Sequence, residues 1–129
     1  MSRAVDPNGV GNRWERTVAD YAYARGFHWD RGRLRGNRDL LDLVGCWDEG
    51  WLIGAKSLSA QTMQARLSTA MNQARDALKT FYAKYPGRSD VIPVQVVQRR
   101  NHRTGRAYVV MEFDDFLRLA EMRRKWEGK

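Results

Sequence analysis

Two short apolar runs separated by the turn Asp-Glu-Gly at residues 48–50 constrain the fold most. They read LLDLVGCW at 40–47 and WLIGAK at 51–56. Each run is shorter than a stable helix and is bounded by turn residues, which predicts the two strands of a β-hairpin. If the charged faces of these strands coincide, Asp42 and Lys56 meet over an otherwise apolar surface. An unpaired charge is costly there, so the two side chains would need each other, a metal ion, or both.

Simpler interpretations of these charges remain open. Asp42 and Lys56 can form an ordinary ion pair at a sheet edge, or Lys56 can end its strand and reach water. Side chains alternate along a strand, so Gly54 lies on the same face as Lys56. Glu15 belongs to a predicted helix that can lean over the sheet, but Asn12 and Glu15 also fit a capping box at the start of that helix.

The rest of the chain alternates between helical and strand-like patterns. Helical spacing of apolar residues occupies 12–25, 60–84 and 114–126, and strand-like runs occupy 27–30, 91–98 and 106–113. Asp114 or Asp115 can cap the last helix. This order predicts an α/β fold in which helices flank a central mixed β-sheet of about five strands. With 129 residues and no dividing linker, we expect one domain at 12–127 preceded by a flexible arm at 1–11.

The charge balance favours a polyanionic partner. The chain has 23 Lys and Arg against 15 Asp and Glu, a net charge of +8. Such an excess is larger than solubility requires and is typical of proteins that bind nucleic acids or other polyanions. No apolar stretch approaches the roughly 20 residues that cross a bilayer, and the first residues lack the apolar core of a signal peptide. We therefore expect no membrane partner and an intracellular, non-secreted protein.

The order of charged residues resembles the PD-(D/E)XK nuclease superfamily, and within it the archaeal-type and phage Holliday junction resolvases. In those proteins a glutamate on the first helix is followed by a strand aspartate and then by Glu-x-Lys. Glu15, Asp42 and Lys56 match these positions, and Ser57 follows the lysine as in many members. Gln73, within NQARDALKTFYAK, matches a glutamine of the family's next helix. The resemblance spans about residues 9–120 and implies a restriction-endonuclease-like fold in a prokaryotic or phage-infected cell.

Gly54 departs from the family pattern, which has Glu or Asp at this position. The resemblance implies that carboxylates hold Mg²⁺ or Mn²⁺ while the lysine orients a water molecule, so the loss of one ligand should weaken metal binding. Gly54 can be an introduced change, a natural feature of an inactive relative, or the sign of an acid that has migrated. Asp39 is the favoured position for such a migrated acid, because Asp48 and Glu49 are more simply turn residues.

Two groups of arginines are candidate contacts for the DNA backbone. The predicted loop before the first hairpin strand carries Arg31, Arg33, Arg35 and Arg38, and a second predicted turn carries Arg99, Arg100, Arg103 and Arg106. Loops with several arginines and no acid suit phosphate contacts, although exposed turns are also commonly charged. In the nuclease family the first loop touches DNA, often with a serine that this chain lacks.

The function expected from these features is that of a Mg²⁺-dependent DNA endonuclease that resolves Holliday junctions or other branched DNA, weakened or inactivated by Gly54. A four-way junction is two-fold symmetric, so a homodimer is expected. The alternatives are a protein on the same fold that binds branched DNA without cutting it, and a basic adaptor that binds a protein partner through its sheet edge.

Overall fold

A computed structural model describes residues 9–31, 40–59 and 61–128. Along the chain lie α1 (Gly9–Ala24), β1 (Asp30–Arg31), β2 (Leu43–Val44), the 3₁₀ turn η4 (Trp47–Glu49), β3 (Trp51–Lys56), α2 (Met63–Lys84), β4 (Ile92–Val97), the 3₁₀ turn η5 (Thr104–Arg106), β5 (Tyr108–Val110) and α3 (Phe113–Glu127). No helix among these described residues is long and apolar enough to cross a membrane.

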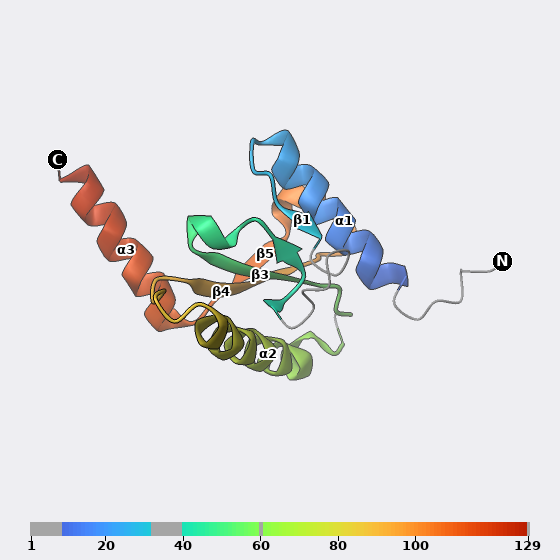
Figure 1. Cartoon of the computed structure of the whole chain (residues 1–129). Helices are drawn as coiled ribbons and strands as arrows, with labels where there is room; N and C mark the ends of the chain where they lie inside the picture. The colour runs from blue at the N-terminus through green and yellow to red at the C-terminus, as the bar shows by residue number, and fades with distance from the viewer. Residues whose placement is uncertain (1–8, 32–39, 60, 129) are drawn as a thin grey trace.

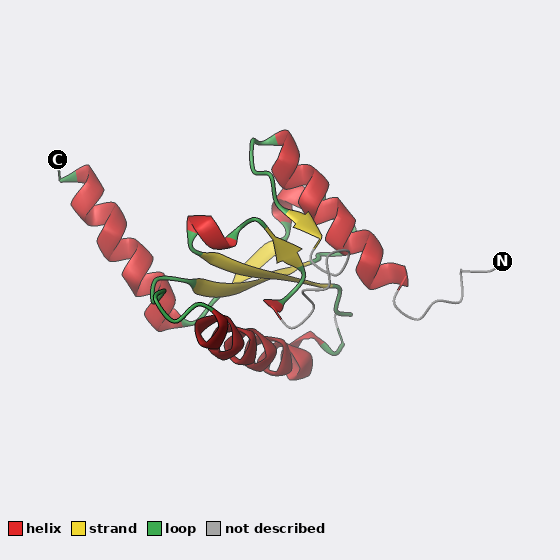
Figure 2. Ribbon diagram, viewed as in Figure 1, coloured by secondary structure: helices red, strands yellow, loops and turns green. Residues whose placement is uncertain are grey.

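The main sheet has the order β3-β4-β5 and lies between α1 and α2 (Figures 1 and 2). β3 and β4 are parallel, with α2 as the crossover between them, and β5 is antiparallel to β4. On β3, Ile53 and Ala55 pack with α1, whereas Leu52 packs with α2. Helices cover both faces, which explains why WLIGAK is a nearly continuous apolar run.

The predicted α/β class is confirmed, but the single sheet of about five strands is not observed. The described strands divide into the three-stranded sheet and a separate antiparallel pair, β1 and β2. β2 pairs with β1 through Asp30 opposite Val44 and Arg31 opposite Leu43, so the predicted hairpin ladder between 40–47 and 51–56 was wrong.

Backbone geometry explains why the run 40–47 does not form one long strand. Leu41 has φ 72°, in the left-handed region that interrupts an extended chain. At Gly45, with φ 87°, a Cβ would lie 2.9 Å from the carbonyl oxygen of His28, so the close approach of two backbone segments requires glycine. The run therefore bends between its buried residues.

The predicted helices are present, but both predicted caps were wrong. α1 begins at Gly9, so Asn12 lies inside the helix and the capping box does not account for Glu15. Glu112 stands at the N-cap of α3, and Asp114 and Asp115 belong to its first turn, where negative charge favours the helix dipole.

Candidate functional site

Asp42 is anchored to β3 by its backbone and its side chain. Its N–H donates to the carbonyl oxygen of Ile53 at 3.1 Å, and its Oδ2 accepts a hydrogen bond from the N–H of Ala55 at 2.8 Å. The half-buried Lys56 is the next residue of β3 and its last. Asp42 and Lys56, which the sequence suggested as partners, therefore lie near the same end of β3. No salt bridge joins them among the described ion pairs.

Glu15 is held at the same level of the sheet by its neighbour on α1. Trp14 donates a hydrogen bond from Nε1 to the carbonyl oxygen of Val96 at 3.0 Å, and Val96 is the partner of Ala55 in the β3–β4 register. Glu15 itself is only 4% exposed. A carboxylate so deeply buried is uncommon unless a cation or hydrogen-bond donor stabilises it.

Arg31 connects the surroundings of Glu15 to those of Asp42. Its Nε lies 3.9 Å from Glu15 Oε1, and across the β1–β2 ladder it faces Leu43, the residue after Asp42. Its side chain is largely buried, which suits an ion pair with Glu15 better than contact with a phosphate. Asp42 and Lys56 thus lie near the end of β3, and Arg31 lies beside Glu15. Lys56 shares the side of β3 that faces α2 with Leu52 and Gly54, whereas Glu15 belongs to α1, which covers the other side of the strand.

Gln95 is a site residue that was not predicted from the sequence. It lies opposite Gly54 in the β3–β4 register and is fully buried, and its Nε2 donates to the carbonyl oxygen of Ala70 in α2 at 2.8 Å. A Cβ on Gly54 would lie 2.1 Å from Gln95 Oε1, an oxygen without a hydrogen-bond partner among the described residues. A neutral amide therefore fills the space in which the family's third acid would begin. The signal that could have identified it was a single polar residue within the apolar run VIPVQVV.

The described residues do not complete a metal site. Hard cations such as Mg²⁺ take oxygen ligands, and Glu15 and Asp42 supply two carboxylates. No group of three or more acidic, histidine or cysteine side chains is present among the residues that the structure describes. Asp39, the candidate for a migrated acid, lies outside the described residues.

The thiol of the buried Cys46 is unreactive at neutral pH. Removal from water raises the pKa of its thiol from the ordinary value of 9.0 to about 12, and Sγ donates weakly to the carbonyl oxygen of Leu43. The thiol therefore stays protonated at neutral pH, and only the thiolate is a strong nucleophile.

The expected DNA contacts occupy different environments. Arg33, Arg35 and Arg38 lie outside the described residues, whereas Gln73 is exposed on α2. Arg99 stacks over the ring of Tyr108, with its Cζ 4.4 Å from the ring centroid, and donates to the carbonyl oxygen of Arg106. Arg99 is thus engaged in holding the connection between β4 and β5, while Arg100 and Arg103 are exposed.

An arginine cluster is defined as Arg25, which follows α1, together with Arg103 and Arg106 of the β4–β5 connection, which contacts α1. Arg25 donates to the hydroxyl of Tyr21 at 2.7 Å. A Cβ on Gly105 would lie 2.4 Å from the same hydroxyl and 3.2 Å from Nη1 of Arg103. All three arginines are exposed, and none forms one of the described salt bridges.

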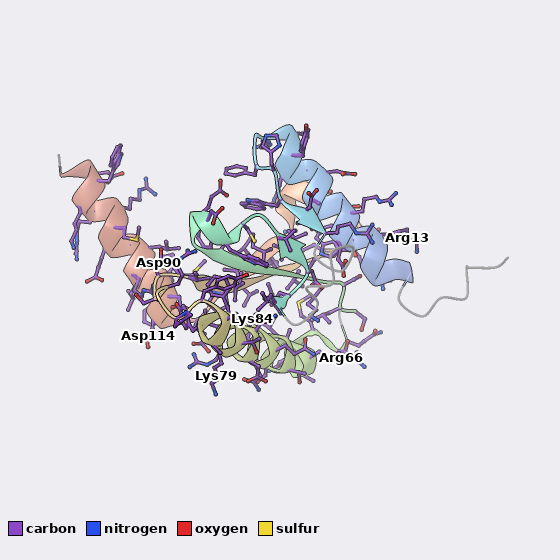
Figure 3. The ribbon with its side chains drawn as sticks, viewed as in Figure 1. Arg13, Arg66, Lys79, Lys84, Asp90 and Asp114 are labelled. Atoms are coloured by element: carbon purple, nitrogen blue, oxygen red, sulfur yellow. The ribbon has the colours of Figure 1, made fainter. Side chains whose placement is uncertain are left out.

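Further exposed basic residues lie on the helices. Arg13 and Arg66 project from α1 and α2, respectively (Figure 3). Arg13 and Arg66 were not among the DNA contacts predicted from the sequence, which were the loop and turn arginines and Gln73. Exposed arginines from two segments that meet in space can contact phosphates without reading base sequence.

Comparisons with protein-family models, with curated proteins and with solved structures found no match.

Proposed function

We propose that the chain is a metal-dependent DNA endonuclease of the PD-(D/E)XK type that acts on Holliday junctions or other branched DNA, with activity weakened at position 54. The proposal includes a restriction-endonuclease-like topology, in which α1 precedes the strand–helix–strand unit β3–α2–β4.

The placement of Asp42 against the backbone of Ala55, with Lys56 next in the strand, carries the proposal. Asp42 is bonded to the backbone of Ala55, Lys56 follows in the strand, and Trp14 fixes the Glu15 segment at the same level. These residues come from three separate parts of the chain, and Glu15 is buried on α1 beside Arg31. Two carboxylates that can hold a metal ion, together with an ammonium that can orient a water molecule, are groups suited to the hydrolysis of a phosphodiester.

Each residue has a distinct role in the proposed site. Glu15 and Asp42 hold Mg²⁺ or Mn²⁺, which supplies charge neutralisation at the scissile phosphate when bound. Lys56 orients the attacking water through its ammonium N–H donors. The arginine cluster and Arg100 bind backbone phosphates, which positions the duplex arms without selecting a sequence.

A second candidate is a protein that binds branched DNA on the same fold without cutting it. The side chain of Gln95 favours this candidate, because it occupies the space that an acid at position 54 would need. Both candidate functions would use the arginine cluster to bind backbone phosphates.

Cleavage of a labelled four-way junction separates the two candidates. We expect feeble Mg²⁺- or Mn²⁺-dependent cutting by the natural chain and little gain in Gly54→Glu, because the new Cβ meets Gln95. Gly54→Glu combined with Gln95→Ala should gain metal-dependent cutting, and adding Lys56→Ala should abolish it. Lys79→Ala, an exposed change on α2, is the control and should leave cutting unchanged.

The other outcomes are equally informative. If none of the variants cuts but all bind the junction, the binding protein is the correct function. Brisk cutting by the natural chain would favour a migrated acid and make Asp39→Ala the deciding variant. A chain that binds neither a junction nor a linear duplex at low salt would contradict both candidates, because backbone binding is strongest there.

A further inference from the structure

Four aromatic side chains gather where α1 ends and the chain turns back toward β1 (Figure 1). They are Tyr23, Phe27, His28 and Trp29. The rings of Tyr23 and His28 meet edge-on with their centroids 4.7 Å apart, and those of Phe27 and Trp29 lie 5.0 Å apart. Tyr23 is 62% exposed and Phe27 is 43% exposed. A contiguous group of exposed rings is more typical of an interaction surface than single apolar residues scattered over the surface.

The 3₁₀ turn η4 places a carboxylate beside these rings. Trp29 donates a hydrogen bond from Nε1 to Glu49 Oε1 at 2.7 Å. The indole is a neutral donor, so it orients the carboxylate without compensating its charge. Asp48 and Glu49 are both exposed, and neither forms one of the described salt bridges. The acidic–aromatic patch is defined as Tyr23, Phe27, His28, Trp29, Asp48 and Glu49.

The arginines nearest to these rings in the sequence are engaged elsewhere. Arg25 donates to the hydroxyl of Tyr21 at 2.7 Å and lies over its ring. Tyr21 and Tyr23 project from opposite sides of α1, because two residues turn a helix by about 200°. Arg31 lies 3.9 Å from the carboxylate of Glu15. The patch therefore carries carboxylates that no described salt bridge neutralises, on a chain whose net charge is +8.

Aromatic faces beside a carboxylate suit the guanidinium group of arginine. A guanidinium stacks on an aromatic ring and donates paired N–H bonds to a carboxylate, whereas a phosphate would be repelled by the acids. Only Oε1 of Glu49 accepts a described hydrogen bond, which leaves Oε2 for such a donor. The charge and the rings of the patch are thus complementary to a basic polypeptide and unsuited to a nucleic acid.

We propose that the acidic–aromatic patch binds arginine side chains of a basic polypeptide partner. Tyr23 and Phe27 provide the exposed ring faces, and Glu49 receives the guanidinium group. The residues assigned above to metal, water and DNA all lie outside the patch. The inference therefore goes beyond the proposed function and does not depend on it.

Binding of a short oligoarginine peptide to the full chain tests the patch. Anisotropy of a labelled peptide reports binding at about 50 mM salt, where attraction between exposed charges is only weakly screened. We expect a Kd on the order of 100 µM or tighter. The net charge of +8 repels a polycation as a whole, so binding reports a local surface. A citrulline peptide, which lacks the charge, should not bind, and oligolysine should bind more weakly, because an ammonium cannot form the same planar stack and paired N–H bonds.

Two variants each remove one feature of the patch. Glu49→Gln removes the charge but keeps an oxygen that can accept the bond from Trp29. Phe27→Leu removes the ring face and keeps an apolar side chain. Each should weaken peptide binding by about threefold or more, which is the effect of losing one exposed ion pair or cation–π contact. Glu121→Gln and Phe113→Leu, the same substitutions at exposed positions of α3, are the matched controls and should bind as the natural chain does.

Three results would overturn the inference. They are no binding at peptide concentrations up to about 1 mM, equal binding of the arginine and citrulline peptides, and patch variants that bind as their controls do. Self-association that is lost in Phe27→Leu would assign the patch to a second copy instead, and junction binding that is lost in Glu49→Gln would assign it to DNA. Circular dichroism confirms that each variant is folded. A chain that cuts or binds junctions but not the peptide would leave the proposed function standing.

Discussion

The packing of Gly54 against Gln95 predicts that the smallest possible side chain at position 54 destabilises the protein. In Gly54→Ala the new Cβ would lie 2.1 Å from Gln95 Oε1 and 2.7 Å from Cδ. Gln95 must therefore move, although it is fully buried and bonded to the carbonyl oxygen of Ala70. Breaking that hydrogen bond costs about 0.5–1.5 kcal/mol and overpacking about 1–3 kcal/mol, against a gain of about 0.5–1 kcal/mol for replacing glycine within a strand. We expect a net loss of about 2 kcal/mol in the free energy of unfolding.

A double-mutant cycle measured by urea unfolding isolates this pair. Gln95→Ala alone should cost about 2 kcal/mol, because it leaves a cavity beside Gly54. In the double variant the new methyl group at position 54 enters that space. The stability loss of the double variant should therefore be smaller than the sum of the two single losses by about 1–2 kcal/mol. Gly87→Ala is the matched control, since a Cβ there meets no atom within 4 Å, and its effect should stay within about 0.5 kcal/mol. A Gly54→Ala variant as stable as this control, or strictly additive losses, would refute the reasoning.

Three further predictions follow from the surface and the core. Replacing Arg100 and Arg103 by Ala should lower the slope of log K against log salt for duplex binding by about one for each phosphate that is no longer bound, while an unchanged slope would move the binding surface elsewhere. Cys46 should react with iodoacetamide at pH 8 only after denaturation, because burial raises the pKa of its thiol to about 12. Rapid labelling of the native protein would contradict this burial. Because the pKa of the folded state is raised, the stabilisation linked to Cys46 should be complete below pH 8 and be lost progressively as the pH rises through 9 toward 12. Cys46→Ala should remove this part of the decrease in the free energy of unfolding at alkaline pH. Trp14→Phe should cost about 1 kcal/mol of stability, since it removes the hydrogen bond to Val96 and keeps most of the apolar packing, and an unfolding midpoint equal to that of the natural chain would show that this bond contributes nothing.

Local sequence patterns predicted most elements, because they depend on a helical or strand repeat within a short window. The helix expected at 60–84 is Met63–Lys84, and the strand expected at 91–98 is Ile92–Val97. The caps could not be predicted as well, since Asn12 and Asp114 are suitable residues at positions where the helix had already begun. Capping propensity is local, whereas the start of a helix also depends on what packs beside it.

The candidate site was predicted in part. Glu15, Asp42 and Lys56 were singled out from charge within or beside apolar segments. The structure places Asp42 and Lys56 near the end of β3, whereas Glu15 is buried on α1 beside Arg31. Gln95 was not predicted as a site residue, because its role depends on which strand pairs with β4. A polar residue in an apolar run identifies a buried polar group, but only the parallel register shows that it stands opposite Gly54.

The sequence by itself determined the α/β class, the excess of positive charge and the three helical segments, since each follows from composition or from a short repeat. The tertiary structure alone decided that β2 pairs with β1, that Gln95 fills the space above Gly54, and that α1 meets the β4–β5 connection at Tyr21. These interactions join residues far apart in the chain. They are selected by close packing and by the hydrogen-bonding needs of buried groups, which no local pattern encodes.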